Sequence, residues 1–206
     1  MTKILVTGFG RFPGAASNPT TAITTQLART ARRRGIDCVA HVFATTYAAV
    51  DRELPQLITA HRPDAILMFG LAGRRRHVSI ELFARNRMSL WFPDAAGVVP
   101  PRAAIAAGAG ASARGRAPFS RLLAAARATR VKTAFSRDAG GYLCNYVYWR
   151  ALEAAARPGG PPRAVFVHVP SLTPRMRRRT GSKRAKFTLN ELVRVGEAIL
   201  VAVSRR

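Results

Sequence analysis

Apolar and polar residues follow two recurring patterns along the chain. Short, nearly continuous apolar runs are typical of strands buried on both faces, and segments with apolar residues three and four positions apart are typical of helices. Strands are expected at residues 3–7, 37–44, 64–70, 131–136 and 164–170, with a segment of alternating character at 77–83. Helices are expected at residues 19–34, 47–61, 119–130, 143–157 and from 188 onward, and the Gly-, Ala- and Pro-rich residues 94–118 predict an irregular excursion or a hairpin. This order predicts an α/β fold, a three-layer α/β/α sandwich with a mostly parallel, twisted central sheet.

Some helix ends are marked by their own residues. Asn18 and Pro19 supply an N-cap and a proline at the first helical position. Thr188 and Glu191 have the spacing of a capping box, which predicts the start of the last helix. Pro55 lies inside the expected helix 47–61 and predicts a bend there.

Length and composition are those of a globular chain. The 206 residues are 48% hydrophobic and contain no internal repeat, so we expect residues 1–206 to form a single domain. No apolar run approaches the roughly 20 residues that span a bilayer, and the first residues enter a strand pattern without the features of a signal peptide. Two cysteines far apart in the sequence favour a reducing compartment over a disulfide scaffold. We therefore expect a cytoplasmic protein with no membrane segment.

The formal net charge of +24 is the most unusual property of the composition. Such a charge attracts nucleic acid and other anionic surfaces. The basic residues cluster at 32–34, 74–76 and 175–186, but aromatic residues for base stacking are not interleaved with them. The pattern favours a solvated basic surface, and nucleic acid is not expected as a partner.

Cys144 has the surroundings of a catalytic cysteine. It follows Gly140 and Gly141 and lies at the start of the helix expected from residue 143. A thiol is nucleophilic as its thiolate, and the positive end of the helix dipole lowers a thiol pKa. The sequence therefore predicts a reactive thiol at Cys144. Cys38 lies inside a strand pattern, which is typical of a structural cysteine.

His168 is the candidate base for this thiol. Ligands bind beyond the carboxyl ends of the strands in open α/β sheets. His168 ends an apolar strand, and Cys144 follows the expected strand 131–136 through a short loop, so both are expected at one edge. A histidine there can take the thiol proton and return a proton to a leaving amine. His41, His61 and His77 are weaker candidates, the last because three adjacent arginines oppose its protonation.

A carboxylate is needed to orient the imidazole and stabilise its charged form. Glu81 is the first candidate, because it lies between Ile80 and Leu82 after the central strand. The alternative is that Glu81 faces solvent on its strand. Asp138 is a second candidate carboxylate, although its place six residues before Cys144 favours a role in shaping the loop. No Cys/His pair has the spacing of a zinc site, so no metal cofactor is expected.

The glycine-rich turn after the first strand has two possible roles. Gly8, Gly10 and Gly14 lack the G-x-G-x-x-G spacing of dinucleotide-binding loops. Phe9 and Phe12 lie on the same turn and either wall a small apolar pocket or plug the end of the sheet. Both interpretations remain open from the sequence.

Together these segments resemble the pyroglutamyl peptidase I (pyrrolidone carboxyl peptidase) family of cysteine peptidases. Four segments carry the resemblance: Ile4 to Phe12 with Asn18-Pro19, Gly70 to Arg74 with Ile80-Glu81 and Ala84 to Asn86, Ala139 to Tyr146, and Phe166 to Pro170. The segments around Cys144 and His168 are the most specific. The family's order of Glu, Cys and His is kept at Glu81, Cys144 and His168.

The resemblance implies hydrolysis of an N-terminal pyroglutamyl residue from peptides through a thioester acyl-enzyme. Cys144 is then the nucleophile, His168 the base and acid, and Glu81 the group that orients His168. The positions expected to contact the substrate are Phe9, Phe12, Leu71, Trp91, Phe92, Tyr142 and Leu143. The resemblance also implies that no cofactor is required and that the chain forms a homo-oligomer, either a dimer or a tetramer.

Three positions depart from the family pattern. Leu71 stands where the family has a glutamine, Trp91 where it has an arginine, and Gly141 where it has a threonine. Arg85 or Arg87 is a candidate to replace the missing arginine. These departures leave two alternatives open: a cysteine hydrolase of the same fold with another acyl or lactam specificity, and a basic binding protein that has lost turnover.

Overall fold

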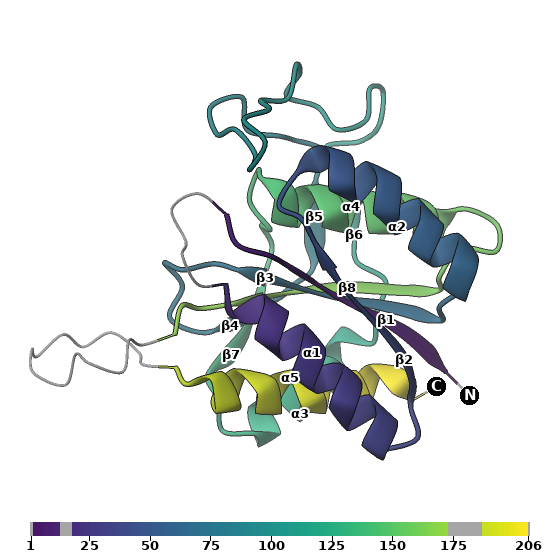
Figure 1. Cartoon of the computed structure of the whole chain (residues 1–206), viewed down its shortest axis with the longest axis vertical. Coiled ribbons are helices and arrows are strands. Elements are labelled where there is room, and N and C mark those ends of the chain that lie inside the picture. Colours follow the sequence, from purple (N-terminus) through teal and green to yellow (C-terminus); the bar gives the residue numbers. More distant parts are fainter. Residues whose placement is uncertain (1, 13–17, 173–186, 206) are drawn as a thin grey trace, which may run out of the picture.

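The computed structural model describes residues 2–12, 18–172 and 187–205, and in these residues a six-stranded sheet lies between two layers of helices (Figure 1). The strands are β1 (Lys3–Phe9), β2 (Asp37–Phe43), β3 (Ala65–Leu71), β4 (Val78–Glu81), β7 (Thr133–Ser136) and β8 (Arg163–Val169), and β5 (Phe83–Arg85) and β6 (Ser112–Arg114) form a separate two-stranded sheet. The helices are α1 (Pro19–Arg33), α2 (Tyr47–His61), α3 (Phe119–Ala128), α4 (Leu143–Ala156) and α5 (Leu189–Ser204). The expected three-layer sandwich is confirmed.

The central sheet is mostly parallel, with one reversal. Its strand order is β2-β1-β3-β8-β4-β7, and the first four strands run in the same direction. β4 pairs antiparallel with β8, and β7 pairs parallel with β4, so both strands at this edge run opposite to the other four. This reversal determines how the active-site residues approach one another.

The two faces of the sheet carry different helices. α1, α3 and α5 pack on one face, with Ile23, Leu27 and Ile199 in their core, and α2 and α4 cover the other face (Figure 1). Side chains such as these are completely buried, and burying one contributes about 1.5–3 kcal/mol relative to leaving it in water. Both faces of the central strands are therefore covered, which explains their continuous apolar runs.

The ends of some helices and strands differ from those expected from the sequence, because tertiary packing determines where these elements begin and end. The segment expected at 77–83 divides into β4 and β5, and all four residues of β4 are buried rather than alternating with solvent-facing positions. α2 continues through Pro55, and the expected strand 131–136 begins only at Thr133. Asn18 caps α1, and Thr188 and Glu191 form the capping box of α5, as predicted.

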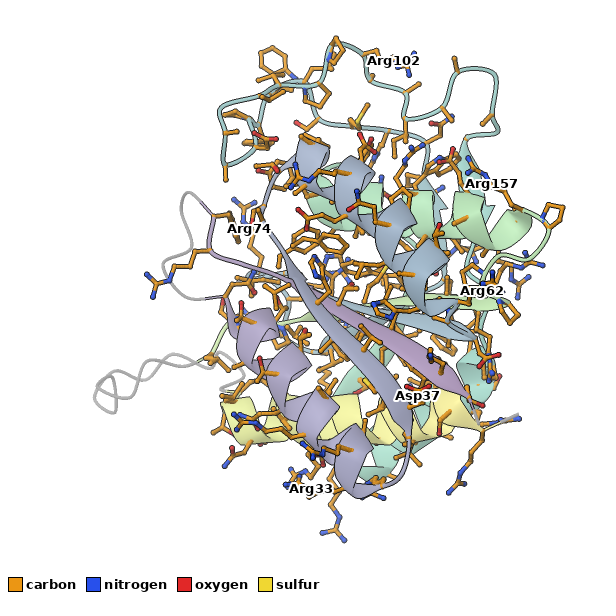
Figure 2. The ribbon with its side chains drawn as sticks, turned by 45° about the vertical axis from the view of Figure 1, so that its right-hand side comes forward. Arg33, Asp37, Arg62, Arg74, Arg102 and Arg157 are labelled. Carbon is orange, nitrogen blue, oxygen red and sulfur yellow. The ribbon has the colours of Figure 1, made fainter. Side chains whose placement is uncertain are left out.

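The basic residues are spread over the surface of the described part of the molecule. Figure 2 shows Arg33 and Arg102 at opposite ends of the view, with Arg74 and Arg157 on opposite sides. This distribution fits a solvated basic surface better than a single binding stripe. The basic segment 175–186 lies outside the described residues. None of the helices described has the length and apolar character needed to cross a membrane.

Candidate active site

The sulfur of Cys144 lies against the carboxyl end of the central strands. Gly70 of β3 is the register partner of His168 of β8. A Cβ atom placed on Gly70 would lie 2.6 Å from Cys144 Sγ and 2.5 Å from the ring of Phe166. The thiol therefore occupies the space that a side chain at position 70 would fill, beside the strand that carries His168.

The route by which the chain brings these residues together differs from the expected one. The sequence predicts Cys144 at the shared edge because it follows a strand, but β7 runs antiparallel to β8, so that reason is wrong. Instead, Cys144 lies in the first turn of α4, which leads into β8, and β8 runs back to end near His168. The start of a helix that precedes a strand in this way lies at the edge where the strand ends.

Glu81 orients the imidazole of His168 through its Nδ1 atom. Its Oε1 accepts a hydrogen bond from His168 Nδ1 at 2.7 Å, and the Glu81 side chain has no exposed surface. The solvent-facing alternative for Glu81 is therefore wrong. Because β4 is antiparallel to β8, Glu81 lies opposite Phe166, deeper in the sheet than His168. With Nδ1 bonded to a carboxylate, Nε2 is the basic nitrogen of the neutral ring.

Arg75 is a member of this cluster that the sequence argument missed. Its Nη1 donates to the same Glu81 Oε1 at 2.5 Å, and its Nη2 donates to the carbonyl of Asp138 at 2.7 Å. The other oxygen, Glu81 Oε2, is buried and has no hydrogen-bond partner among the described residues. In the sequence, Arg75 is the middle residue of a run of three arginines, and spacing alone does not show which one turns inward.

The protonation state of Cys144 also differs from the expectation. Burial of the thiol and the nearby Glu81 raise the pKa of Cys144 to about 12, while Arg75 and the backbone N–H at the helix start act in the opposite direction. The predicted lowering of the Cys144 pKa is therefore wrong, because the loss of hydration outweighs the groups that lower it. The resting thiol is protonated at neutral pH.

His168 is neutral in the same state. Burial lowers its pKa below the ordinary value, although the hydrogen bond to Glu81 raises it. A neutral thiol beside a neutral imidazole is the starting state for general-base catalysis, in which the proton moves as the sulfur attacks. The directions of the two pKa shifts thus both favour the neutral forms of Cys144 and His168.

A cavity of about 470 Å³ opens beside His168. It is lined by Ala72, Arg75, Ser136, Arg137, Asp138, Ala139, Gly140 and His168. Asp138 shapes this loop, because it accepts a hydrogen bond from Gly140 N at 2.9 Å and forms an ion pair with Arg87 at 2.9 Å. Gly140 has a φ of +90°, a conformation that favours glycine. Asp138 therefore has the loop-shaping role that its sequence position favoured.

Asn145 fixes the start of α4 and was also missed. It is fully buried, and its side chain accepts a hydrogen bond from Arg85 N at 2.7 Å. It donates to Arg85 O at 2.8 Å and to Arg87 O at 3.0 Å. These bonds tie the residue next to Cys144 to β5 and the segment after it. The only sequence sign is a polar residue on the buried side of a helix, which does not identify its partners.

The structure separates the residues expected to contact the substrate. Phe9 and Leu143 are buried in the core beside α2 and α4, with Phe9 packed against Phe43. Phe12, Leu71 and Tyr142 are half-buried, whereas Trp91 and Phe92 are exposed. These residues do not line the cavity beside His168, and their contacts with a substrate remain predictions.

The remaining histidines have other surroundings. Burial first, and then Arg75 and Lys132, lower the pKa of His77, which confirms that nearby cations oppose its protonation. His41 bonds to Glu53 at 2.8 Å. Within residues 2–12, 18–172 and 187–205, no group of three or more His, Cys, Asp or Glu side chains is arranged to hold a metal ion.

A cysteine at a helix start, a histidine at a strand end and a buried carboxylate on an α/β/α sandwich define a cysteine hydrolase. Comparison with known proteins identifies the family: the pyroglutamyl peptidase profile matches residues 2–206. The chain belongs to the pyroglutamyl peptidase family.

Individual relatives agree with this assignment. The pyrrolidone-carboxylate peptidase of Thermococcus kodakarensis is 33% identical over 168 residues, which cover 82% of this chain and 81% of that protein. Pyrrolidone-carboxylate peptidase 1 of Ralstonia nicotianae is 33% identical over 175 residues, covering 84% and 80%. The crystal structure of Bacillus amyloliquefaciens pyroglutamyl peptidase I superposes with a TM-score of 0.86 at 25% identity, covering 99% of this chain and 97% of that one. The two sequence alignments cover 82% and 84% of this chain, and the structural superposition covers 99% of it.

Proposed function

We propose that this cysteine peptidase removes the pyroglutamyl residue from the N-terminus of peptides, with Cys144, His168 and Glu81 as its catalytic residues. The observation that carries the proposal is the arrangement around Gly70. Cys144 Sγ lies over this glycine, whose register partner His168 is bonded to Glu81. Nucleophile, base and orienting carboxylate thus meet at one edge of the sheet.

The first half of the reaction forms an acyl-enzyme. Cys144 Sγ attacks the carbonyl carbon of the bond after the pyroglutamyl residue, and His168 takes the thiol proton. The tetrahedral intermediate collapses to a thioester as the C–N bond breaks, and His168 gives its proton to the leaving amine. Water then attacks the thioester with His168 again as base, which releases pyroglutamate and restores the thiol.

Two features of the site support this sequence of proton transfers. Glu81 stabilises the imidazolium that forms during attack, since its carboxylate faces Nδ1 in a buried setting. The N-cap of α4, Tyr142, makes no side-chain hydrogen bond to the first turn. The first N–H groups of α4 can therefore act as oxyanion donors, aimed where negative charge develops on the carbonyl oxygen.

Hydrolysis of a pyroglutamyl amide of a fluorescent amine tests the proposal. Cys144→Ala is expected to lower kcat/KM by more than about 1,000-fold, because it removes the nucleophile. Cys38→Ala is the matched control, since Cys38 lies on β2 and burial raises its pKa to about 11. Mass spectrometry of an acid-quenched reaction should show the pyroglutamyl adduct on the peptide that contains Cys144. Turnover by Cys144→Ala at the wild-type rate would contradict the assignment.

We propose further that residues 1–206 act as one catalytic domain in the cytoplasm and assemble as a dimer or tetramer. The unpaired Cys38 and Cys144 support a reducing compartment. Light scattering over a range of protein concentrations tests the assembly, and a constant monomer mass would refute it.

A further inference from the structure

Three consecutive apolar residues are exposed on the segment that follows β5. The exposed fractions are 45% for Leu90, 87% for Trp91 and 66% for Phe92. Exposed aromatic surface of this extent commonly marks a binding surface in a soluble protein. Trp149, the other tryptophan of the chain, is only 4% exposed. Of the two tryptophans, only Trp91 is exposed to solvent.

The turn that carries these residues is fastened at both ends to the segment before Cys144. On one side, Ser89 N donates to Gly141 O at 2.6 Å. On the other side, the hydroxyl of Tyr142 donates to Pro93 O at 2.9 Å. Because Gly141 and Tyr142 directly precede α4, the turn is held beside the start of the helix that carries the nucleophile.

The chemistry of the substrate shows which part of it can reach this turn. The nitrogen of a pyroglutamyl residue is closed into the lactam, so no peptide extends from that side of the scissile bond. Every further residue of the substrate lies on the leaving side. That part of the peptide must pass the rim of the site, where the turn of Leu90, Trp91 and Phe92 is fastened.

We propose that Trp91 and Phe92 bind an apolar side chain of the leaving peptide, so that the enzyme prefers pyroglutamyl peptides with an apolar or aromatic residue after the scissile bond. This inference rests on the proposed function. An aromatic pair offers a large apolar surface that a matching side chain covers. The nearby cation Arg87 is already paired with Asp138, which leaves the apolar surface as the feature of the turn that selects a ligand.

Competition among three peptides of equal length tests the preference. They carry pyroglutamate followed by phenylalanine, alanine or glutamate, with the same C-terminal amide, and release of free pyroglutamate is measured. We expect kcat/KM to be about 10-fold higher for the phenylalanine peptide than for the alanine peptide. Trp91→Ala should reduce that ratio to about 2, and Phe135→Ala should leave it unchanged. Phe135 is a matched control because it is an exposed aromatic, 38%, packed against α3 on the other face of the sheet.

Fluorescence measures the binding itself. Trp149→Phe leaves Trp91 as the only indole, and Cys144→Ala prevents turnover. Adding the phenylalanine peptide to this double variant should shift the emission of Trp91 to shorter wavelength, because the bound side chain excludes water from the indole. The alanine peptide at the same concentration should give a smaller shift.

The remaining outcomes each have one meaning. Equal hydrolysis of all three peptides, or a ratio that survives Trp91→Ala, overturns the inference and leaves the proposed function intact. A preference for the glutamate peptide that disappears in salt would assign selectivity to the positive charge. A change in light-scattering mass in Trp91→Ala with an unchanged ratio would assign the turn to contact with a second copy. If the wild-type enzyme hydrolyses none of the peptides, the proposed function itself fails.

Discussion

Replacing Gly70 by alanine adds a methyl group at the place where the thiol of Cys144 lies. The new Cβ would be 2.6 Å from Cys144 Sγ, 2.5 Å from Phe166 Cζ and 2.9 Å from Phe166 Cε1. Ordinary carbon contacts need about 3.5–4 Å, so the sulfur and the ring must together move by roughly 1 Å. A displacement of that size at a reacting atom costs about 100-fold in rate, or about 2.7 kcal/mol of transition-state stabilisation.

Crowding also lowers stability, and a second glycine separates the two effects. Gly8→Ala would place its Cβ 2.6 Å from Thr24 Oγ1 and 2.9 Å from Thr20 O, against α1 instead of the thiol. Both variants should lose about 1–3 kcal/mol of unfolding free energy in urea. Only Gly70→Ala should lose about 100-fold in kcat/KM on the pyroglutamyl amide when the folded fraction is matched. Wild-type kcat/KM in Gly70→Ala, or an equal loss in Gly8→Ala, would refute the idea that position 70 places the sulfur.

Four further predictions concern the ionisable groups and the helix start. Because burial lowers the pKa of His168, kcat/KM should stay constant as the pH falls to 6.5 and decline only below that pH. A decline that begins above pH 7 would contradict a neutral resting imidazole. With the pKa of Cys144 raised to about 12, its alkylation by iodoacetamide should rise steadily from pH 7 to 10, whereas a plateau near neutrality would indicate a resting thiolate. The Glu81 carboxylate raises the pKa values of both Cys144 and His168. Glu81→Gln should therefore move the acidic limb of the pH profile to lower pH and reduce kcat/KM about 100- to 10,000-fold. An unmoved limb would show that Glu81 acts only by packing. Asn145→Ala removes the side-chain partner of three backbone groups, Arg85 N, Arg85 O and Arg87 O, and should cost about 1–3 kcal/mol of unfolding free energy. An unchanged urea midpoint would refute this role.

The fold could be predicted because the apolar pattern of each helix and strand shows which of its faces are buried. The runs that became β1, β3 and β8 are continuously apolar, since helices cover both faces of the sheet. The direction of β4 and β7 could not be predicted. Strands of four residues carry no mark of direction, and the reversal depends on which neighbours they find in the folded chain.

The site, like the fold, has residues that the sequence predicts and residues that it does not. Cys144, His168 and Glu81 could be proposed because a reactive residue type at an element boundary is visible in the sequence. Arg75 and Asn145 could not, because nothing in the sequence shows that Arg75 joins Glu81 to the carbonyl of Asp138 or that Asn145 bonds to the backbone of Arg85. The direction of the Cys144 pKa shift was mistaken for a related reason. A helix start is a local feature, but the removal of water from the thiol is a property of the whole fold.

The fastening of the turn at Leu90, Trp91 and Phe92 has a consequence for how this enzyme can diversify. Both anchors end on main-chain oxygens, those of Gly141 and Pro93, and neither uses a side chain of the three exposed residues. Substitutions at these positions therefore leave the scaffold of the nucleophile undisturbed. Lineages, or a randomised library, can exchange the three side chains and retune the choice of peptide while the chemistry is inherited intact.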